Sequence, residues 1–289
     1  MNAVSRERRL SAVGLVLGAA CSVQGGAAVA KSLFPQLGPP GVVFLRLLFG
    51  SAALWAIARP QLRGRPRSEL RLPAALGVVL VSMNLTFYES IERLPLGIAV
   101  TVEFLGPLAV AVIGSRRRVD LLWVALAGGG VALLAQGGGA AVKPLGIVLA
   151  ATAGFFWALY ILLSVHVGRA FPGATGLAPA MALGAVLAAP WGIISAGHNL
   201  REPQLVGAAV GVGLLSSALP WSLELEALRR LPSHVFSVVL SLEPAVAALA
   251  GVVFLHEHLR VRAWLAIALV VLASAGAAGR YTPPGPPDA

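Results

Sequence analysis

Hydrophobic residues run through this chain in long blocks that are separated by short polar connections. A helix that crosses about 30 Å of hydrocarbon needs roughly 20 mainly apolar residues. The stretches that meet this requirement lie at residues 10–30, 40–58, 72–91, 95–114, 119–136, 144–165, 174–196, 205–227, 232–255 and 261–279. The pattern therefore predicts an all-α integral membrane protein with ten transmembrane helices.

The composition supports a membrane environment and excludes several other classes of protein. Hydrophobic residues make up 57% of the chain and charged residues only 12%, about half of the roughly 25% found in soluble domains. So few charges cannot cover the surface of a soluble domain, which excludes soluble enzymes, disordered proteins and nucleic-acid binders. The single cysteine, Cys21, allows neither an internal disulfide nor a cysteine metal cluster. We therefore expect a lipid bilayer, and no nucleic acid, around the protein.

The polar segments of the chain lie in one loop and at the two ends. Residues 59–71 are rich in Arg and Pro and are predicted to form a loop, and the Pro-rich residues 281–289 are predicted to be a disordered tail. The first apolar run is about 20 residues long, whereas the apolar region of a signal peptide has 7–15. We therefore expect an uncleaved first helix.

Lys and Arg residues are distributed unequally between the two sets of connections. With ten spans, 15 of the 22 fall on the side of the N-terminus and six on the opposite side, while Arg46 lies inside a span. Positive side chains accumulate on the cytoplasmic side of membrane proteins. We therefore predict a multi-pass protein of a bacterial-type inner membrane, with both termini in the cytoplasm.

The sequence repeats itself at an interval of 137 residues. Residues 93–95 and 230–232 both read Arg-Leu-Pro, and twelve residues after these prolines come Pro107 and Pro244. The repeat divides the chain into two units, 1–139 and 140–280.

Each unit holds five predicted spans, an odd number, so the two copies are expected to lie in inverted orientation. Inverted repeats are typical of secondary transporters, which expose a site at the middle of the membrane to each side in turn. The alternative is that an ancient duplication built a membrane protein with another role. The sequence leaves open whether the protein forms a homo-oligomer.

Charged residues inside the predicted spans are the strongest candidates for function. Glu103 and Glu243 fall near the middle of their spans, Arg46 lies about 8 Å from the start of its span, and Glu224 lies nearer the cytoplasmic end. Intramembrane charges usually face the bundle interior or a water-filled cavity. A carboxyl group there can alternate between a neutral and a charged form, as a proton-coupled carrier requires. A fixed ion pair with Arg46 or a structural acid is the alternative.

Two prolines accompany the midplane acids. Pro107 follows Glu103 by four residues, and Pro244 follows Glu243 directly. A proline inside a helix leaves the carbonyl one turn earlier without its hydrogen bond, so the carbonyl of Glu103 is free for a ligand or a neighbouring helix. We predict helix-breaking hinges at both prolines, with a packing kink as the alternative.

Further polar and aromatic residues within spans could line a cavity and hold an ammonium group. These candidates are Gln24, Asn84, Trp157, Tyr160 and Trp221. Tyr88 is also polar, but tyrosine accumulates at bilayer interfaces for other reasons. The glycine pairs 14/18 and 207/211 are predicted to allow close helix packing.

Neither a metal nor a cofactor is predicted. The sequence His256-Glu257-His258 lacks the one-face spacing of a helical zinc motif, and no nucleotide-binding loop or nucleophile elbow is present. An enzyme inside the membrane would need a catalytic group that the sequence does not show. A scaffold without transport activity would give no reason for midplane acids.

Several stretches resemble the EamA-type branch of the drug/metabolite transporter superfamily, and within it the threonine/homoserine exporters. The matching text is SVQGG (22–26), AKSLFP (30–35), PLGIAV (95–100), EF (103–104), GPLAV (106–110), LPWSLE (219–224), RLP (230–232), SLEPA (241–245) and FLHE (254–257). The resemblance implies a ten-helix inner-membrane carrier that exports small amino acids, driven by the proton gradient. Two positions depart from the family pattern, His256 in place of Gly and Trp221 in place of Tyr. Export of drugs or other metabolites by the same fold is the alternative function.

Overall fold

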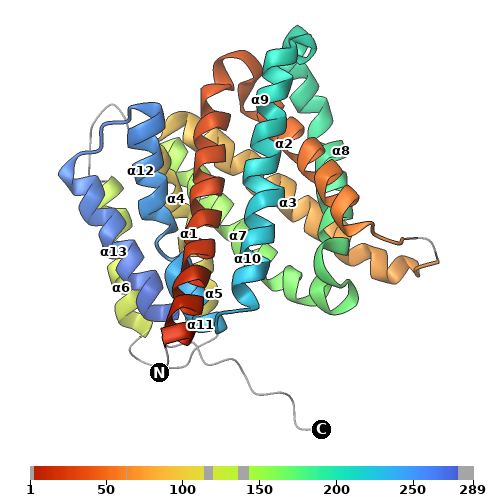
Figure 1. Cartoon of the computed structure of the whole chain (residues 1–289). Coiled ribbons are helices and arrows are strands. Elements are labelled where there is room, and N and C mark those ends of the chain that lie inside the picture. The colour runs from red at the N-terminus through yellow and green to blue at the C-terminus, as the bar shows by residue number, and fades with distance from the viewer. Residues whose placement is uncertain (1–2, 63, 114–119, 136–142, 279–289) are drawn as a thin grey trace.

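The computed structural model describes residues 3–62, 64–113, 120–135 and 143–278, and in these residues every regular element is a helix. The helices lie side by side as a bundle (Figure 1). The longer ones are α1 (Ala3–Ser32), α2 (Phe34–Ala58), α3 (Arg67–Arg93), α6 (Asp120–Ala135), α7 (Pro144–Ala170), α8 (Leu177–Ala196), α12 (Glu243–Leu255) and α13 (Val261–Ala278). The shorter ones are α4 (Leu96–Glu103), α5 (Leu105–Ile113), α9 (Pro203–Gly213), the π-helical turn η3 (Leu214–Ala218), α10 (Leu219–Leu228) and α11 (Ser233–Leu240). The predicted tail 281–289 lies outside the described residues.

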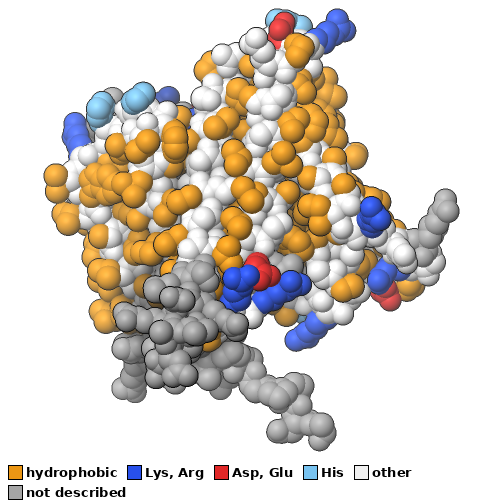
Figure 2. All heavy atoms as spheres, in the orientation of Figure 1, with side chains coloured by type: hydrophobic (Ala, Val, Ile, Leu, Met, Phe, Trp, Pro, Cys, Tyr) orange, Lys and Arg blue, Asp and Glu red, His pale blue; other side chains and the backbone are white. Residues whose placement is uncertain are grey.

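Most of these helices are long and apolar enough to cross a membrane. Among the described residues, nine helical segments meet that condition, and a further apolar helix, Leu121–Leu134, is shorter. On the face seen in Figure 2, hydrophobic side chains cover the side of the bundle, whereas charged side chains lie mainly toward its two ends. Because bulk water would not stabilise such an apolar surface, the fold is that of a multi-pass helical membrane protein.

Several helix boundaries lie outside those expected from the sequence, and the starts of α3 and α2 show why. The segment 67–71, predicted to be loop, is the first turn of α3, which starts after the extended Pro66 and carries Glu69 near its positive end. Helix α2 begins at Phe34 rather than at residue 40, and it bends at Gly38, whose φ of +66° is not helical. Apolar length alone identifies the part of a helix that lies in lipid, so it misses polar or kinked turns beyond the bilayer.

Two of the spans are interrupted near their centres. One is divided into α4 and α5 at Phe104, three residues before Pro107, and the other into α11 and α12 at residues 241–242, shortly before Pro244. Helices α4 and α11 begin at Leu96 and Ser233, at the same 137-residue interval that separates the sequence repeats.

The closest helix contacts occur at glycines that face neighbouring backbone. A Cβ atom on Gly97 of α4 would lie 2.6 Å from Cβ of Ala248 on α12, and one on Gly106 of α5 would lie 1.9 Å from the carbonyl oxygen of Gly154 on α7. The prediction of close packing at the pairs 14/18 and 207/211 is wrong. Three of these glycines have no neighbouring atom within 4 Å of a Cβ position, and Gly18 has only an ordinary contact at 3.7 Å.

Candidate functional site

A cavity of about 370 Å³ lies within the bundle and is lined by helices from both halves of the chain. All nine residues that the sequence suggested for substrate binding or coupling line it, namely Gln24, Arg46, Asn84, Glu103, Trp157, Tyr160, Trp221, Glu224 and Glu243. Of the two predicted hinge prolines, Pro107 lines the cavity, while Pro244 is buried in α12 and is not among the lining residues. Polar groups from distant parts of the sequence therefore meet in one place.

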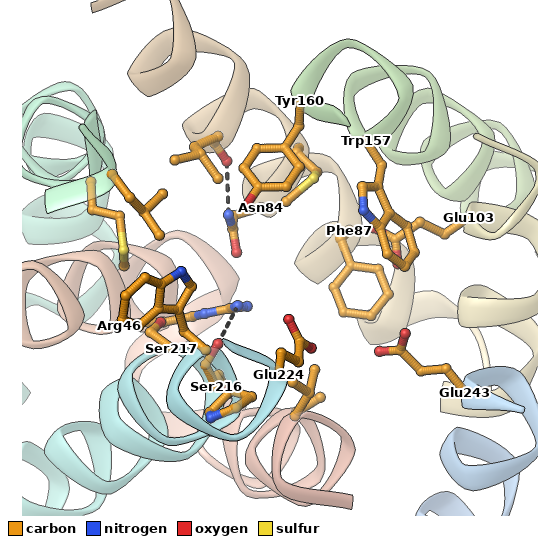
Figure 3. A pocket seen from close by; sticks show the side chains of 18 of the residues that line it. Arg46, Asn84, Phe87, Glu103, Trp157, Tyr160, Ser216, Ser217, Glu224 and Glu243 are labelled. Carbon is orange, nitrogen blue, oxygen red and sulfur yellow. Dashed lines mark hydrogen bonds between the residues drawn. The ribbon is translucent and has the colours of Figure 1, made fainter. Parts of the chain in front are cut away.

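The cavity carries charges of opposite sign on opposite walls. Arg46 is the only Lys or Arg among the lining residues, and it faces the carboxyl groups of Glu224 and Glu243, while Glu103 lies on their side of the cavity, beside Trp157 (Figure 3). The side chains of all three acids, Glu103, Glu224 and Glu243, line the same cavity. Glu103 and Glu243 expose only 7% and 6% of their surface, so these acids are held away from bulk water.

Arg46 is fixed by two neutral partners rather than by an acid. Its Nη1 donates to the hydroxyl of Tyr88 at 3.0 Å, and its Nη2 donates to the carbonyl of Ser216 at 3.1 Å. In the part of the chain that the structure describes, no carboxylate lies within ion-pair distance of Arg46. The fixed ion pair considered from the sequence is therefore not formed.

The carbonyl that accepts from Arg46 is available because of a local irregularity. Pro220 has no amide hydrogen to donate to the carbonyl of Ser216 four residues earlier. The chain forms the π-helical turn η3 at this point, and a neighbouring carbonyl, that of Leu215, accepts from the hydroxyl of Ser22 at 2.6 Å. Helices α1 and α2 thus supply the hydrogen bonds that the interrupted helix lacks.

The two midplane acids have different surroundings. The Oε1 atom of Glu243, the first residue of α12, accepts from Nε2 of Gln24 at 2.9 Å. Glu103 is the last residue of α4, and its own backbone carbonyl packs against Gly154 of α7, where a Cβ atom would lie 2.5 Å away. Of the two uses predicted for this carbonyl, ligand or neighbouring helix, the structure has the second.

Aromatic rings shape the remaining walls. Trp157 packs edge-on against Phe104, with ring centroids 5.2 Å apart, at the break between α4 and α5. Tyr88 is fully buried, and its ring centroid lies 5.8 Å from those of both Phe34 and Phe87, so the interfacial role considered from the sequence is not its role here. The amide of Asn84 donates to the carbonyl of Leu80 in its own helix.

An ion pair lies at the end of α1 opposite the N-terminus. Nζ of Lys31, at the end of α1, lies 2.7 Å from Oε1 of Glu257 and donates to the carbonyl of Leu94 at 2.8 Å. The other carboxylate oxygen of Glu257 accepts from the amide of Leu96, the first residue of α4. Glu257 therefore caps a helix and pairs with a lysine, a role that the sequence around His256 did not indicate.

A bundle of membrane-spanning helices around a buried cavity with opposed charges is the architecture of a membrane transporter of small molecules. Comparison with known proteins agrees with this class. The model of the EamA-like transporter family matches residues 10–136 and again 144–278. The chain belongs to the EamA-like transporter family, which confirms the resemblance found in the sequence and the prediction of a transporter rather than an enzyme.

Curated relatives extend over nearly the whole chain. The threonine/homoserine exporter RhtA of Escherichia coli (strain K12) is 44% identical over 269 residues, which cover 91% of this chain and 89% of the relative. The threonine/homoserine exporter RhtA of Salmonella typhimurium (strain SL1344) is 43% identical over 265 residues, with the same coverage. A solved crystal structure with 20% identity shares the fold, with a TM-score of 0.62 over 92% of this chain and 95% of its own.

Proposed function

We propose that this protein is a secondary transporter that exports small amino acids such as threonine or homoserine across the inner membrane in exchange for protons. The observation that carries the proposal is the separation of charge in the cavity, with Arg46 on one wall and acidic side chains on the other. An amino acid is a zwitterion, and its carboxylate and ammonium groups match this separation. The names of the RhtA relatives support the same substrate class.

The transporter has ten spans arranged as two inverted repeats, 1–139 and 140–280. The span that brings the number from nine to ten is the fifth along the chain, and it contains the short helix Leu121–Leu134, which is apolar throughout. Separate family matches to residues 10–136 and 144–278 support the division. An even number of spans agrees with the start of α1 and the end of α13 lying at the same end of the bundle (Figure 1). With the charge bias of the sequence, that end is cytoplasmic.

Arg46 and the acidic residues of the cavity have different roles in the transport cycle. Arg46 binds the carboxylate of the substrate, and the acids with the rings of Trp157, Tyr160 and Trp221 surround its ammonium group. Glu103 and Glu243 carry the exchanged protons, since they are the most buried of the acids. The helix breaks beside Pro107 and Pro244 serve as hinges when the two repeats rock between inward-facing and outward-facing states.

Export of drugs or other metabolites by the same fold is the second candidate function. It is favoured by Trp221, which lines the cavity where the family pattern has Tyr and which lacks the hydroxyl that a tyrosine would offer to a polar substrate. The rest of the mechanism, including the proton exchange, is the same for either substrate.

Counterflow in proteoliposomes separates the two candidates. Liposomes containing the purified protein are loaded with unlabelled threonine or homoserine, and the entry of the labelled compound is followed without a pH gradient. Entry above that of protein-free liposomes, and competition by other small amino acids but not by aromatic drugs, is the expected result. Folded protein that exchanges only drugs or other metabolites would contradict the amino-acid assignment.

A further inference from the structure

Arg46 has donors left over after its two hydrogen bonds. A guanidinium carries five N–H groups, of which the structure uses one toward Tyr88 and one toward Ser216. Its Nε atom is buried and has no hydrogen-bond partner. The side chain nevertheless lines the cavity, so part of its donor edge is both desolvated and unoccupied.

The two partners hold the guanidinium in one orientation. The ring of Tyr88 is fixed between Phe34 and Phe87, and it also lies 5.5 Å from the guanidinium carbon of Arg46. On the other side, the carbonyl of Ser216 is open to Arg46 because Pro220 cannot donate to it. Neither partner carries a charge, so these two hydrogen bonds position Arg46 without neutralising it.

We propose that Tyr88 and the proline-freed carbonyl of Ser216 are positioning groups, which hold Arg46 so that its remaining N–H edge selects substrates that bear a carboxylate. The inference rests on the proposed function only for the identity of the substrate. A buried cation with unused donors gains most from an anion that accepts two parallel hydrogen bonds, as a carboxylate does. A ligand without a carboxylate leaves those donors unpaired, which costs about 10- to 100-fold in affinity.

Pro220 makes the positioning testable without changing a charge in the cavity. The variant Pro220→Ala restores an amide hydrogen that can donate to the carbonyl of Ser216 and so compete with Arg46. The variant Tyr88→Phe removes the other acceptor and keeps the ring in place. Both changes loosen the orientation of the guanidinium, and neither removes it.

The test compares pairs of ligands that differ only in the carboxylate. Purified protein is titrated with threonine and homoserine and with the corresponding amino alcohols, and binding is followed by tryptophan fluorescence, since Trp157 and Trp221 line the cavity. We expect the wild-type protein to prefer the amino acids by at least about 10-fold. In Tyr88→Phe and Pro220→Ala this preference falls several-fold, while the affinity for the amino alcohols stays the same.

A matched control is available in the same helix as Tyr88. The hydroxyl of Thr86 bonds only to carbonyls of α3, so Thr86→Val removes a hydroxyl without touching Arg46. This variant should keep the wild-type preference. A variant of Tyr88 or Pro220 that weakens both members of a ligand pair equally would show a merely structural role and would overturn the inference.

The same titration distinguishes this inference from the proposed function. Wild-type protein that does not bind threonine or homoserine, but binds another small carboxylate more tightly than its uncharged analogue, would refute the proposed substrate. The same result would support the role of Arg46. Wild-type protein that binds amino acids and amino alcohols equally would leave the substrate class in place and refute the positioning. Binding of carboxylate-free compounds alone would contradict both.

Discussion

Beside the break between α4 and α5 lies a backbone contact that a single methyl group would disrupt. In the variant Gly154→Ala, the new Cβ would lie 2.5 Å from the carbonyl oxygen of Glu103 and 3.2 Å from its carbonyl carbon. Both atoms belong to backbone, so no flexible side chain can turn aside. Helix α7 must therefore move away from the end of α4, where Glu103 enters the cavity.

The magnitude follows from two opposing effects. Forcing an additional carbon into a closely packed contact costs about 1–3 kcal/mol. Replacing glycine by alanine inside a helix gains up to about 1 kcal/mol because the unfolded backbone loses freedom. A second glycine of α7, Gly168, has no atom within 4 Å of its Cβ position, so Gly168→Ala keeps the gain without the clash. The stability difference between the two variants isolates the packing cost.

The assay is thermal unfolding of both purified variants in the same detergent, followed by substrate binding. We expect Gly154→Ala to unfold several degrees below Gly168→Ala, since about 1 kcal/mol corresponds to roughly 2–4 °C in chains of 150–250 residues. Gly154→Ala should also bind substrate more weakly because Glu103 is displaced. Equal unfolding temperatures and equal affinities would refute the packing that places α4 and α7 beside the cavity.

Two further predictions concern charged residues. Replacing Glu243 or Glu103 by Gln should abolish transport driven by a pH gradient but preserve substrate counterflow; normal gradient-driven flux in both variants would exclude them as coupling groups. In Glu257→Gln, one of the bonds to Lys31 and the amide of Leu96 is lost, at a cost of about 1.5–3 kcal/mol for a bond to a charged group. We expect these bonds to close the outer end of the cavity. The test places a cysteine at Ala27 in a Cys21→Ser background and adds an impermeant thiol reagent outside. With Glu257→Gln this cysteine should react about tenfold faster or more than with Glu257 intact. An unchanged rate would show that the ion pair does not control access.

Much of the fold could be predicted from the sequence because the bilayer imposes a simple rule. A helix satisfies its backbone hydrogen bonds within itself, and its side chains must be apolar where they meet lipid. Apolar blocks such as 144–165 and 261–279 therefore correspond closely to α7 and α13. The same rule says nothing about polar turns outside the lipid, which explains the early start of α3 at Arg67.

Glycine spacing was a poor guide to helix packing. The pair Gly14 and Gly18 has the pattern of a close contact, but close approaches to neighbouring backbone occur at Gly106 and Gly154 instead. A spacing of four residues places two glycines on one face of a helix without indicating whether that face meets lipid or another helix. Only the assembled bundle distinguishes the two.

The cavity residues could be predicted because polar side chains within a span must avoid lipid. Glu103 and Glu243, far apart in the sequence, therefore meet in the interior. Tyr88 could not be assigned in this way, since a tyrosine suits both an interface and a buried hydrogen bond. Lys31 and Glu257 are 226 positions apart in the sequence, so their pairing can be recognised only in the tertiary structure.

The account predicts that substrate and protons move in opposite directions through one cavity. The most direct measurement uses proteoliposomes with a pH-sensitive dye inside, and follows the internal pH after threonine or homoserine is added outside. Wild-type protein should couple substrate entry to proton exit, so that the interior becomes more alkaline, and an imposed pH gradient should drive substrate accumulation. Substrate counterflow without any movement of protons, from protein that is demonstrably folded, would contradict the proposed coupling.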